Sequence, residues 1–99
     1  MVLLLLKYVK PIDEVDRLMP GHRDFLDRFH RAGKLVLSGP REPRTGEVML
    51  ADVESEVEAM KIVVEDPFFS EKVAHYEVVG FTATRGDARF AALVEGAAA

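Results

Sequence analysis

The 99-residue sequence predicts an α+β fold of the ferredoxin-like kind, a split β-α-β-β-α-β arrangement. Two observations predict it: two segments carry apolar residues at helical spacing, and four shorter segments read as strands on either side of them. In this arrangement an antiparallel sheet carries both helices on one face. The length suits one domain, which we expect to span residues 1–95, with residues 96–99 as a frayed tail.

The first half of the chain should hold one strand and one main helix. The strand is predicted over Val2–Val9, where the apolar residues do not alternate, so both of its faces should be covered. A short helical segment capped by Asp13 follows, and Met19 should leave the helical conformation because it precedes Pro20. The main helix should then begin at Pro20 and end at Gly33, which accepts the left-handed conformation.

The second half should begin with an extended hairpin. Strands are predicted over Lys34–Gly39 and Glu47–Ala51, joined by the polar, arginine-rich loop 40–46. Ser55 and Glu58 form a capping-box pattern that opens the second helix. The sequence Asp-Pro-Phe-Phe at residues 66–69 should end that helix.

The last strand is predicted over residues 73–84, and Asp87 should cap a short C-terminal helix. This strand offers apolar residues on both of its sides, as the first strand does. With both helices on one face, the other face of the sheet would be a large bare apolar surface, which is unusual for a monomer. We therefore expect a two-fold homodimer that buries the helix-free face, giving a dimeric α/β-barrel assembly.

Composition narrows the setting in which the protein works. The formal charge of −4 and the pI near 5.3 argue against a nucleic-acid or membrane partner, which would favour a basic face. The opening apolar run is too short to span a bilayer and lacks the features of a signal peptide, so we expect a cytoplasmic protein. The chain contains no Cys, Asn or Gln, and this absence predicts high thermal stability.

His22 is the most suggestive single residue. Phe25, Leu26 and Phe29 follow it at helical spacing, so the imidazole should share their buried face. A histidine in such a place can be a core-edge residue bonded to backbone, or it can act as a general base or acid. The helix N-terminus would disfavour its charged form and a nearby carboxylate would favour it, which together would keep its pKa near neutrality.

Other polar residues have two readings as well. Asp66 before Pro67 suits a helix cap, and Ser38 precedes a Gly-Pro turn without the surroundings of a serine nucleophile. Arg41 and Arg44 either belong to a solvated loop or hold an anionic group of a substrate.

Metal and cofactor sites are not predicted. His22, His30 and His75 lack metal-binding spacing, so we expect no metal. No glycine-rich loop opens a helix as a phosphate site would require, and we expect no cofactor.

Several stretches together resemble the YCII-related (YciI-like) family. They are the helix and strand GHRDFLDRFHRAGKLVLSGP, the strand PRTGEVMLA, and the DPF turn followed by HYEVVGF, which place the resemblance over about residues 2–81. The resemblance implies a dimeric α+β barrel akin to muconolactone-isomerase-like proteins. It also implies an active site that pairs His22 with Asp66, and proton chemistry of a lyase or isomerase.

Two classes of function stay open at this point. The first is a small enzyme that moves protons on a compact, anionic or cyclic organic substrate. His22 would be its base, Asp66 would orient His22, and Ser38, Arg41 and Arg44 would contact the substrate. The second is a non-catalytic dimeric module that binds a small metabolite or serves an assembly. A pocket beside a hydrogen-bonded pair of His22 and Asp66 would favour the first.

Overall fold

The computed structural model describes residues 1–94, and the expected frayed tail lies outside the described residues. Within them the chain forms a four-stranded sheet of order β2-β3-β1-β4, in which every neighbouring pair is antiparallel. The predicted α+β class and antiparallel sheet are confirmed. The elements are β1 (Val2–Tyr8), α1 (Ile12–Arg31), β2 (Leu35–Pro40), β3 (Gly46–Ala51), α2 (Glu56–Val63), α3 (Pro67–Ser70), β4 (Ala74–Gly80) and the 3-10 helix η1 (Ala88–Leu93).

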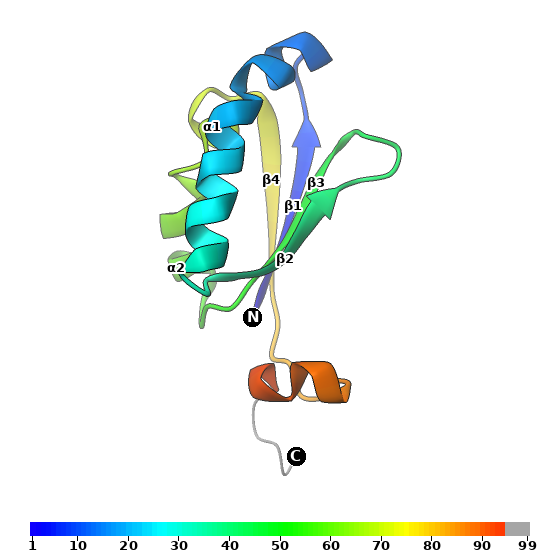
Figure 1. Cartoon of the computed structure of the whole chain (residues 1–99), viewed down its shortest axis with the longest axis vertical. Coiled ribbons are helices and arrows are strands. Elements are labelled where there is room, and N and C mark those ends of the chain that lie inside the picture. The colour runs from blue at the N-terminus through cyan, green and yellow to red at the C-terminus, as the bar shows by residue number, and fades with distance from the viewer. Residues whose placement is uncertain (95–99) are drawn as a thin grey trace.

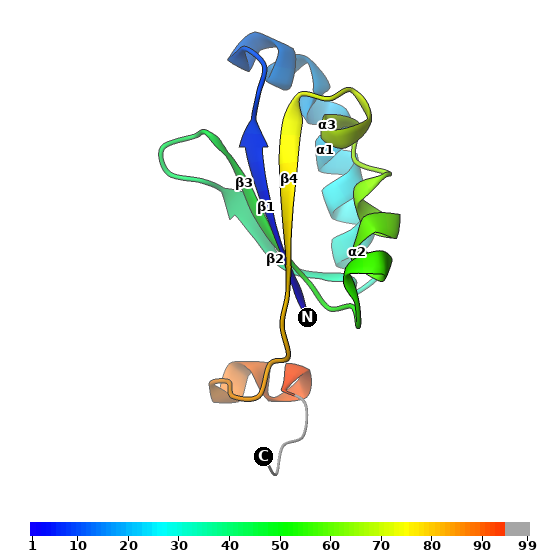
Figure 2. The same cartoon turned by 180° about the vertical axis from the view of Figure 1, so that it is seen from behind.

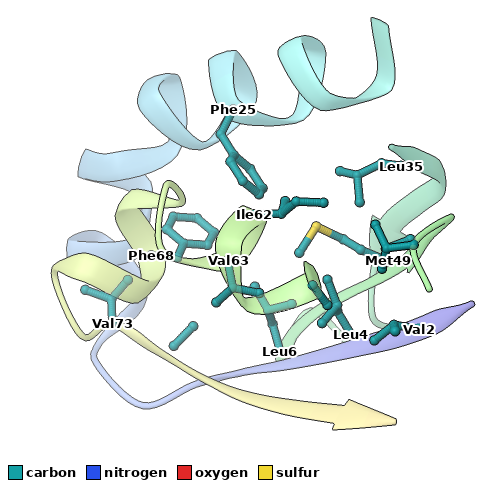
Figure 3. Close-up of a cluster of buried hydrophobic side chains, with 14 of the residues drawn as sticks. Val2, Leu4, Leu6, Phe25, Leu35, Met49, Ile62, Val63, Phe68 and Val73 are labelled. Carbon is teal, nitrogen blue, oxygen red and sulfur yellow. The ribbon is translucent and has the colours of Figure 1, made fainter. Parts of the chain in front are cut away.

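The helices α1, α2 and α3 lie together on one side of the sheet, as the two opposite views show (Figures 1 and 2). Strand residues of one parity face these helices and are buried, among them Leu4 and Leu6 of β1 and Met49 of β3. Phe25 of α1 and Phe68 of α3 close the same core from above (Figure 3). Fully burying a side chain of this size contributes about 1.5–3 kcal/mol.

Helix α1 differs from the prediction. It is one continuous element of 20 residues, and Pro20 lies inside it instead of beginning it. Proline removes a backbone donor and disfavours a helical residue before it, yet both are tolerated here. The apolar face explains this, because Val15 in the first part and Phe25 in the second are both buried in the same core. Packing therefore overrides the local preference.

The relative direction of α1 and α2 decides where the site can form. Each helix returns the chain against the strand that it follows, and β3 is antiparallel to β1, so α2 runs opposite to α1 (Figures 1 and 2). The end of α2 therefore lies at the same end of the sheet as the first half of α1. Parallel helices would have separated His22 from Asp66. The β2–β3 hairpin causes the reversal.

Close approach between α1 and α3 completes this arrangement. A Cβ atom at Gly21 would lie 3.3 Å from Cγ of Pro67, so a glycine lets the ring of Pro67 pack closely against α1 at this point. Gly21 and Pro67 directly adjoin His22 and Asp66 in the sequence. The contact thus brings the two predicted site residues together.

The helix-free face of the sheet carries a continuous set of apolar side chains that are half-buried or exposed. They are Leu3 and Leu5 of β1, Leu37 of β2, Val48 and Leu50 of β3, and Val79 of β4, with Phe81 just beyond it. The predicted bare apolar face is therefore present. Burial of this face in a homodimer stays a prediction.

Several boundaries and caps follow the prediction closely. Ser55 accepts a hydrogen bond from the Glu58 amide, and Gly33 adopts a φ of 75°. Strand β4 ends at Gly80, earlier than predicted, and the chain then leaves the sheet toward η1, which lies beyond its end (Figure 1). Asp87 caps η1 as expected. No helix among residues 1–94 is long and apolar enough to cross a membrane.

Candidate active site

His22 is completely buried in the middle of α1, ten residues after the helix begins. Its ring stacks on Phe68 with the centroids 4.0 Å apart and the planes 7° from parallel. Phe25 lies against the ring as well, at 5.9 Å between centroids. The predicted effect of a helix N-terminus on His22 does not apply, because that effect is confined to the first turn.

Both ring nitrogens of His22 contact buried carboxylates. Nδ1 lies 2.8 Å from Oδ1 of Asp66, and Nε2 lies 2.9 Å from Oε1 of Glu47. Asp66 is fully buried, whereas the Glu47 side chain keeps 9% of its surface exposed. The imidazole is thus held from two opposite edges, and only Glu47 of the two carboxylates reaches toward solvent.

Asp66 caps a helix and orients the histidine at the same time. Its Oδ1 accepts a hydrogen bond from the Phe68 amide at 3.0 Å, the N-cap bond of α3, in addition to its contact with His22. The hydroxyl of Tyr76 donates to the other oxygen, Oδ2. Burial and the nearby Asp66 raise the pKa of Tyr76, so the phenol stays protonated and remains a donor. Asp66 is therefore both the helix cap that its position before Pro67 predicts and a partner of His22.

The sheet register explains why Glu47 reaches His22 while Tyr76 reaches the histidine's partner Asp66. Leu6 in the central strand β1 pairs with Glu47 of β3 on one side and with Tyr76 of β4 on the other. These three residues form one row across the sheet, and their side chains point to the helix-covered face. His22 in α1 lies above the row. Four separate segments therefore supply the polar groups of the site.

The charges of the site favour a protonated histidine. Burial lowers the pKa of His22, but the hydrogen bonds and negative charges of Asp66 and Glu47 outweigh it and raise that pKa from 6.5 to about 9. At neutral pH the ring is therefore an imidazolium that donates through both nitrogens.

A pocket of about 410 Å³ opens beside this cluster. His22 and Glu47 form its inner end, and Arg44 with Asp16 forms an ion pair of 2.6 Å at its border. A volume of this order falls in the usual range for small-molecule sites, about 300–1,000 Å³. The remaining lining residues are Tyr8, Met19, Arg23, Leu26 and Pro40.

A family model for the YCII-related domain matches residues 1–82, which is most of the chain and includes every residue of the cluster. The chain belongs to the YCII-related domain family. The predicted resemblance is thus confirmed.

Comparison with solved structures finds the same fold in an enzyme. The structure is that of 5-chloro-2-hydroxyhydroquinone dehydrochlorinase (TftG) from Burkholderia phenoliruptrix AC1100, in complex with 2,5-dihydroxybenzoquinone. The two chains are 19% identical, with a TM-score of 0.68, over 83% of this chain and 94% of the other. At this identity the likeness establishes the fold alone. No curated protein matches the chain by sequence.

The predicted substrate-contacting residues of this YCII-related domain separate into two groups. Arg44 borders the pocket. Arg41 is not among the pocket residues, and its guanidinium lies 3.4 Å from the backbone oxygen of Leu6. Ser38 lies outside the pocket too, where its hydroxyl is 2.7 Å from Nε2 of His30 near the surface.

No group of three or more side chains is placed to hold a metal ion within residues 1–94. His22, Glu47 and Asp66 do not converge on one point, because the imidazole ring itself fills the space between the two carboxylates.

Glu47 and Tyr76 were absent from the predicted site. Their signal was strand parity: Glu47 alternates with the buried Met49 and Ala51, and Tyr76 alternates with the buried Ala74. An acidic residue on the buried face of a strand requires a partner, which in this YCII-related domain is the histidine.

Proposed function

We propose that this YCII-related protein is a small acid–base enzyme of the lyase or isomerase kind. It would transfer a proton on a compact organic substrate, with His22 and Asp66 at the centre of the reaction. The observation that carries the proposal is a buried imidazole clamped between two carboxylates at the end of a small-molecule pocket. An ionisable group with a strongly shifted pKa in such a place is typical of a functional site.

The protonation state of His22 determines whether it first donates or first accepts a proton. With a pKa of about 9, the ring is the acid form at neutral pH, so its first step is to donate a proton. After donation it is the base form and can take a proton from another position of the substrate. Asp66 is a positioning residue in this scheme, since it holds Nδ1 and has no exposed surface.

Glu47 stands between the ring and the pocket. The His22 side chain has no exposed surface, whereas the Glu47 side chain is 9% exposed and lines the pocket. A proton that passes between His22 and a substrate would therefore cross the Glu47 carboxylate or require that carboxylate to move aside. Glu47 is the group of this pair that we propose touches the substrate.

The structural neighbour supports this reaction class. It is named a dehydrochlorinase, and loss of hydrogen chloride from an organic molecule includes the loss of a proton. The ligand of that structure is a small hydroxyquinone. We therefore propose cyclic compounds that carry carbonyl or enol oxygens as the first substrates to test, together with lactones.

The test is proton exchange with solvent. Lactones, cyclic diketones and 2,5-dihydroxybenzoquinone would be incubated with the protein in D₂O, and replacement of carbon-bound hydrogen would be followed by NMR. We expect exchange of at least one compound above the rate without protein, a loss of that exchange in His22→Gln, and a reduction in Asp66→Asn. Asp27→Asn removes an exposed carboxylate from the outer face of α1 and is the matched control.

Exchange that is equal in the wild type and in His22→Gln would contradict the proposal. Thermal stabilisation of the wild type by a compound, with no exchange of any compound, would instead identify a small-metabolite-binding module. Thermal melts of every variant establish that it is folded before exchange is compared.

A further inference from the structure

The hydroxyl of Tyr8 is a buried polar atom whose hydrogen has no acceptor in the protein. Among the described residues it is the one buried side-chain oxygen or nitrogen without a hydrogen bond of ordinary geometry, and its neighbour Arg44, which lowers its pKa, can only donate to it. The rest of the side chain is well held, since its ring packs edge-on against Phe68 at 5.8 Å between centroids. Leaving a buried hydroxyl unpaired is costly, and such an atom calls for an explanation.

The sheet register places this hydroxyl beside the proton-transfer cluster. Tyr8 follows Leu6 by two residues on β1, so both side chains point to the helix-covered face. Glu47 pairs directly with Leu6, which makes Tyr8 and Glu47 diagonal neighbours on adjacent strands. Diagonal neighbours lie roughly 7–8 Å apart at the backbone and are within reach of long side chains. Tyr8 and Glu47 both line the pocket.

The charges around Tyr8 keep it a donor. Burial raises the pKa of Tyr8, and the negative charge of Glu47 adds to the rise, whereas the nearby Arg44 opposes it. The hydroxyl therefore remains protonated at neutral pH, with a hydrogen to give. Arg44 brings a positive charge to the same side of the pocket, held there by Asp16.

We propose that Tyr8 and Arg44 form an oxyanion subsite that holds the ionised or carbonyl oxygen of a small cyclic substrate. The inference rests on the proposed function for the identity of the reacting end of the pocket, and it adds the end that recognises the substrate. A substrate oxygen placed here would accept the hydrogen bond that the Tyr8 hydroxyl lacks. Met19, Leu26 and Pro40 supply the apolar walls against which a flat ring would pack.

The subsite would also stabilise the negative charge that proton transfer creates on the substrate. When Glu47, the carboxylate that reaches the pocket, takes a proton from carbon next to a carbonyl group, the electron pair of the C–H bond forms a C=C bond and the proton stays on Glu47. The carbonyl oxygen then becomes the enolate oxygen and carries the negative charge. A donor fixed at that oxygen stabilises the charge as it develops. Tyr8 would donate to it, and the Arg44 guanidinium would supply the balancing charge.

The experiment measures binding of benzoate, a flat ring with one anionic group, to the wild-type protein and to variants by NMR and calorimetry. Benzyl alcohol, which has the same ring and no charge, is the comparison ligand. We expect benzoate to shift the ring signals of Tyr8 and to bind better than benzyl alcohol. Tyr8→Phe should weaken benzoate binding by roughly tenfold or more, the usual loss for a hydrogen bond to a charged group.

The arginine has a matched control. Arg44→Gln removes an exposed ion pair with Asp16, and Arg28→Gln removes a comparable exposed ion pair with Glu65, at 2.7 Å on another part of the surface. We expect weaker benzoate binding in Arg44→Gln and unchanged binding in Arg28→Gln.

Three results would overturn the proposal: no response of Tyr8 to benzoate at its highest soluble concentration, equal binding by Tyr8→Phe, or equal binding of benzyl alcohol. Failure of the proposed function looks different. In that case benzoate would bind at Tyr8 as expected, and the wild type would catalyse no proton exchange. Conversely, proton exchange that depends on His22, in a protein that does not bind benzoate, would support the proposed enzyme and contradict the oxyanion subsite.

Discussion

Replacing Asp66 with Asn should lower the pKa of His22 by more than one unit. The ring has two carboxylate partners at nearly equal distances, 2.8 and 2.9 Å, and its pKa is raised from 6.5 to about 9. The net rise is about 2.5 units, and burial works against it. If the partners contribute about equally, each accounts for at least half of the rise, on the order of 2 kcal/mol. The pKa of His22 in Asp66→Asn should therefore fall clearly below that of the wild type.

The assay is an NMR titration of the imidazole nitrogens of His22 between acidic and alkaline pH. Glu47→Gln should give a fall of similar size, since it removes the other partner. Asp27→Asn, on the exposed face of α1, should leave the titration curve of His22 unchanged. A His22 curve in Asp66→Asn that superimposes on that of the wild type would refute the electrostatic clamp, even with the crystal geometry of the variant intact.

Four further outcomes are expected. Because the pKa of His22 is higher in the folded protein, its protonation adds about 3 kcal/mol to the free energy of unfolding. This stabilisation is complete below pH 6.5 and is lost as the pH rises through 9, so the urea concentration at the unfolding midpoint should decrease over that pH range. Gly46→Ala should destabilise by more than about 2 kcal/mol in urea melts, because its Cβ would lie 1.8 Å from the Leu6 carbonyl oxygen, whereas Gly39→Ala, with no atom within 4 Å, should not. Light scattering should find a dimer at micromolar concentration. A monomer would contradict the prediction that the helix-free face of the sheet is buried in a homodimer. The melting temperature should exceed the range of about 45–65 °C typical of mesophilic domains. A reversible melt inside that range would show that the absence of Asn and Gln reflects codon usage and not thermal stability.

Local sequence signals predicted the elements of this fold well. The apolar run of β1, the left-handed Gly33, and the capping residues Ser55 and Asp87 all behave as their local chemistry requires. Pro20 and Asp13 were exceptions. A local rule placed a boundary at Pro20, where the buried face of a long helix continues, and Asp13, predicted as a cap, lies inside the first turn of α1, which begins at Ile12. A preference of one residue yields when the residues on both sides of it pack into one core.

The site was harder to predict than the fold. His22 was found by its helical spacing, and Asp66 entered only through the resemblance to the YCII-related family. Their contact needed the direction of α2, a property of the whole topology rather than of any segment. Glu47 and Tyr76 needed the pairing register of three strands, since only that register places them on either side of Leu6. Such relations are long-range and leave little trace in local patterns.

The clamp around His22 also has a consequence for the lifetime of the folded state. It joins residues 44 and 25 positions apart in the chain, so it can close only after α1, the β3 strand and the segment before α3 have docked. Interactions that form after the folding barrier do not change the rate of folding, and their loss appears in the rate of unfolding. Asp66→Asn should therefore shorten the time that a molecule stays folded, while leaving the time that it needs to fold almost the same.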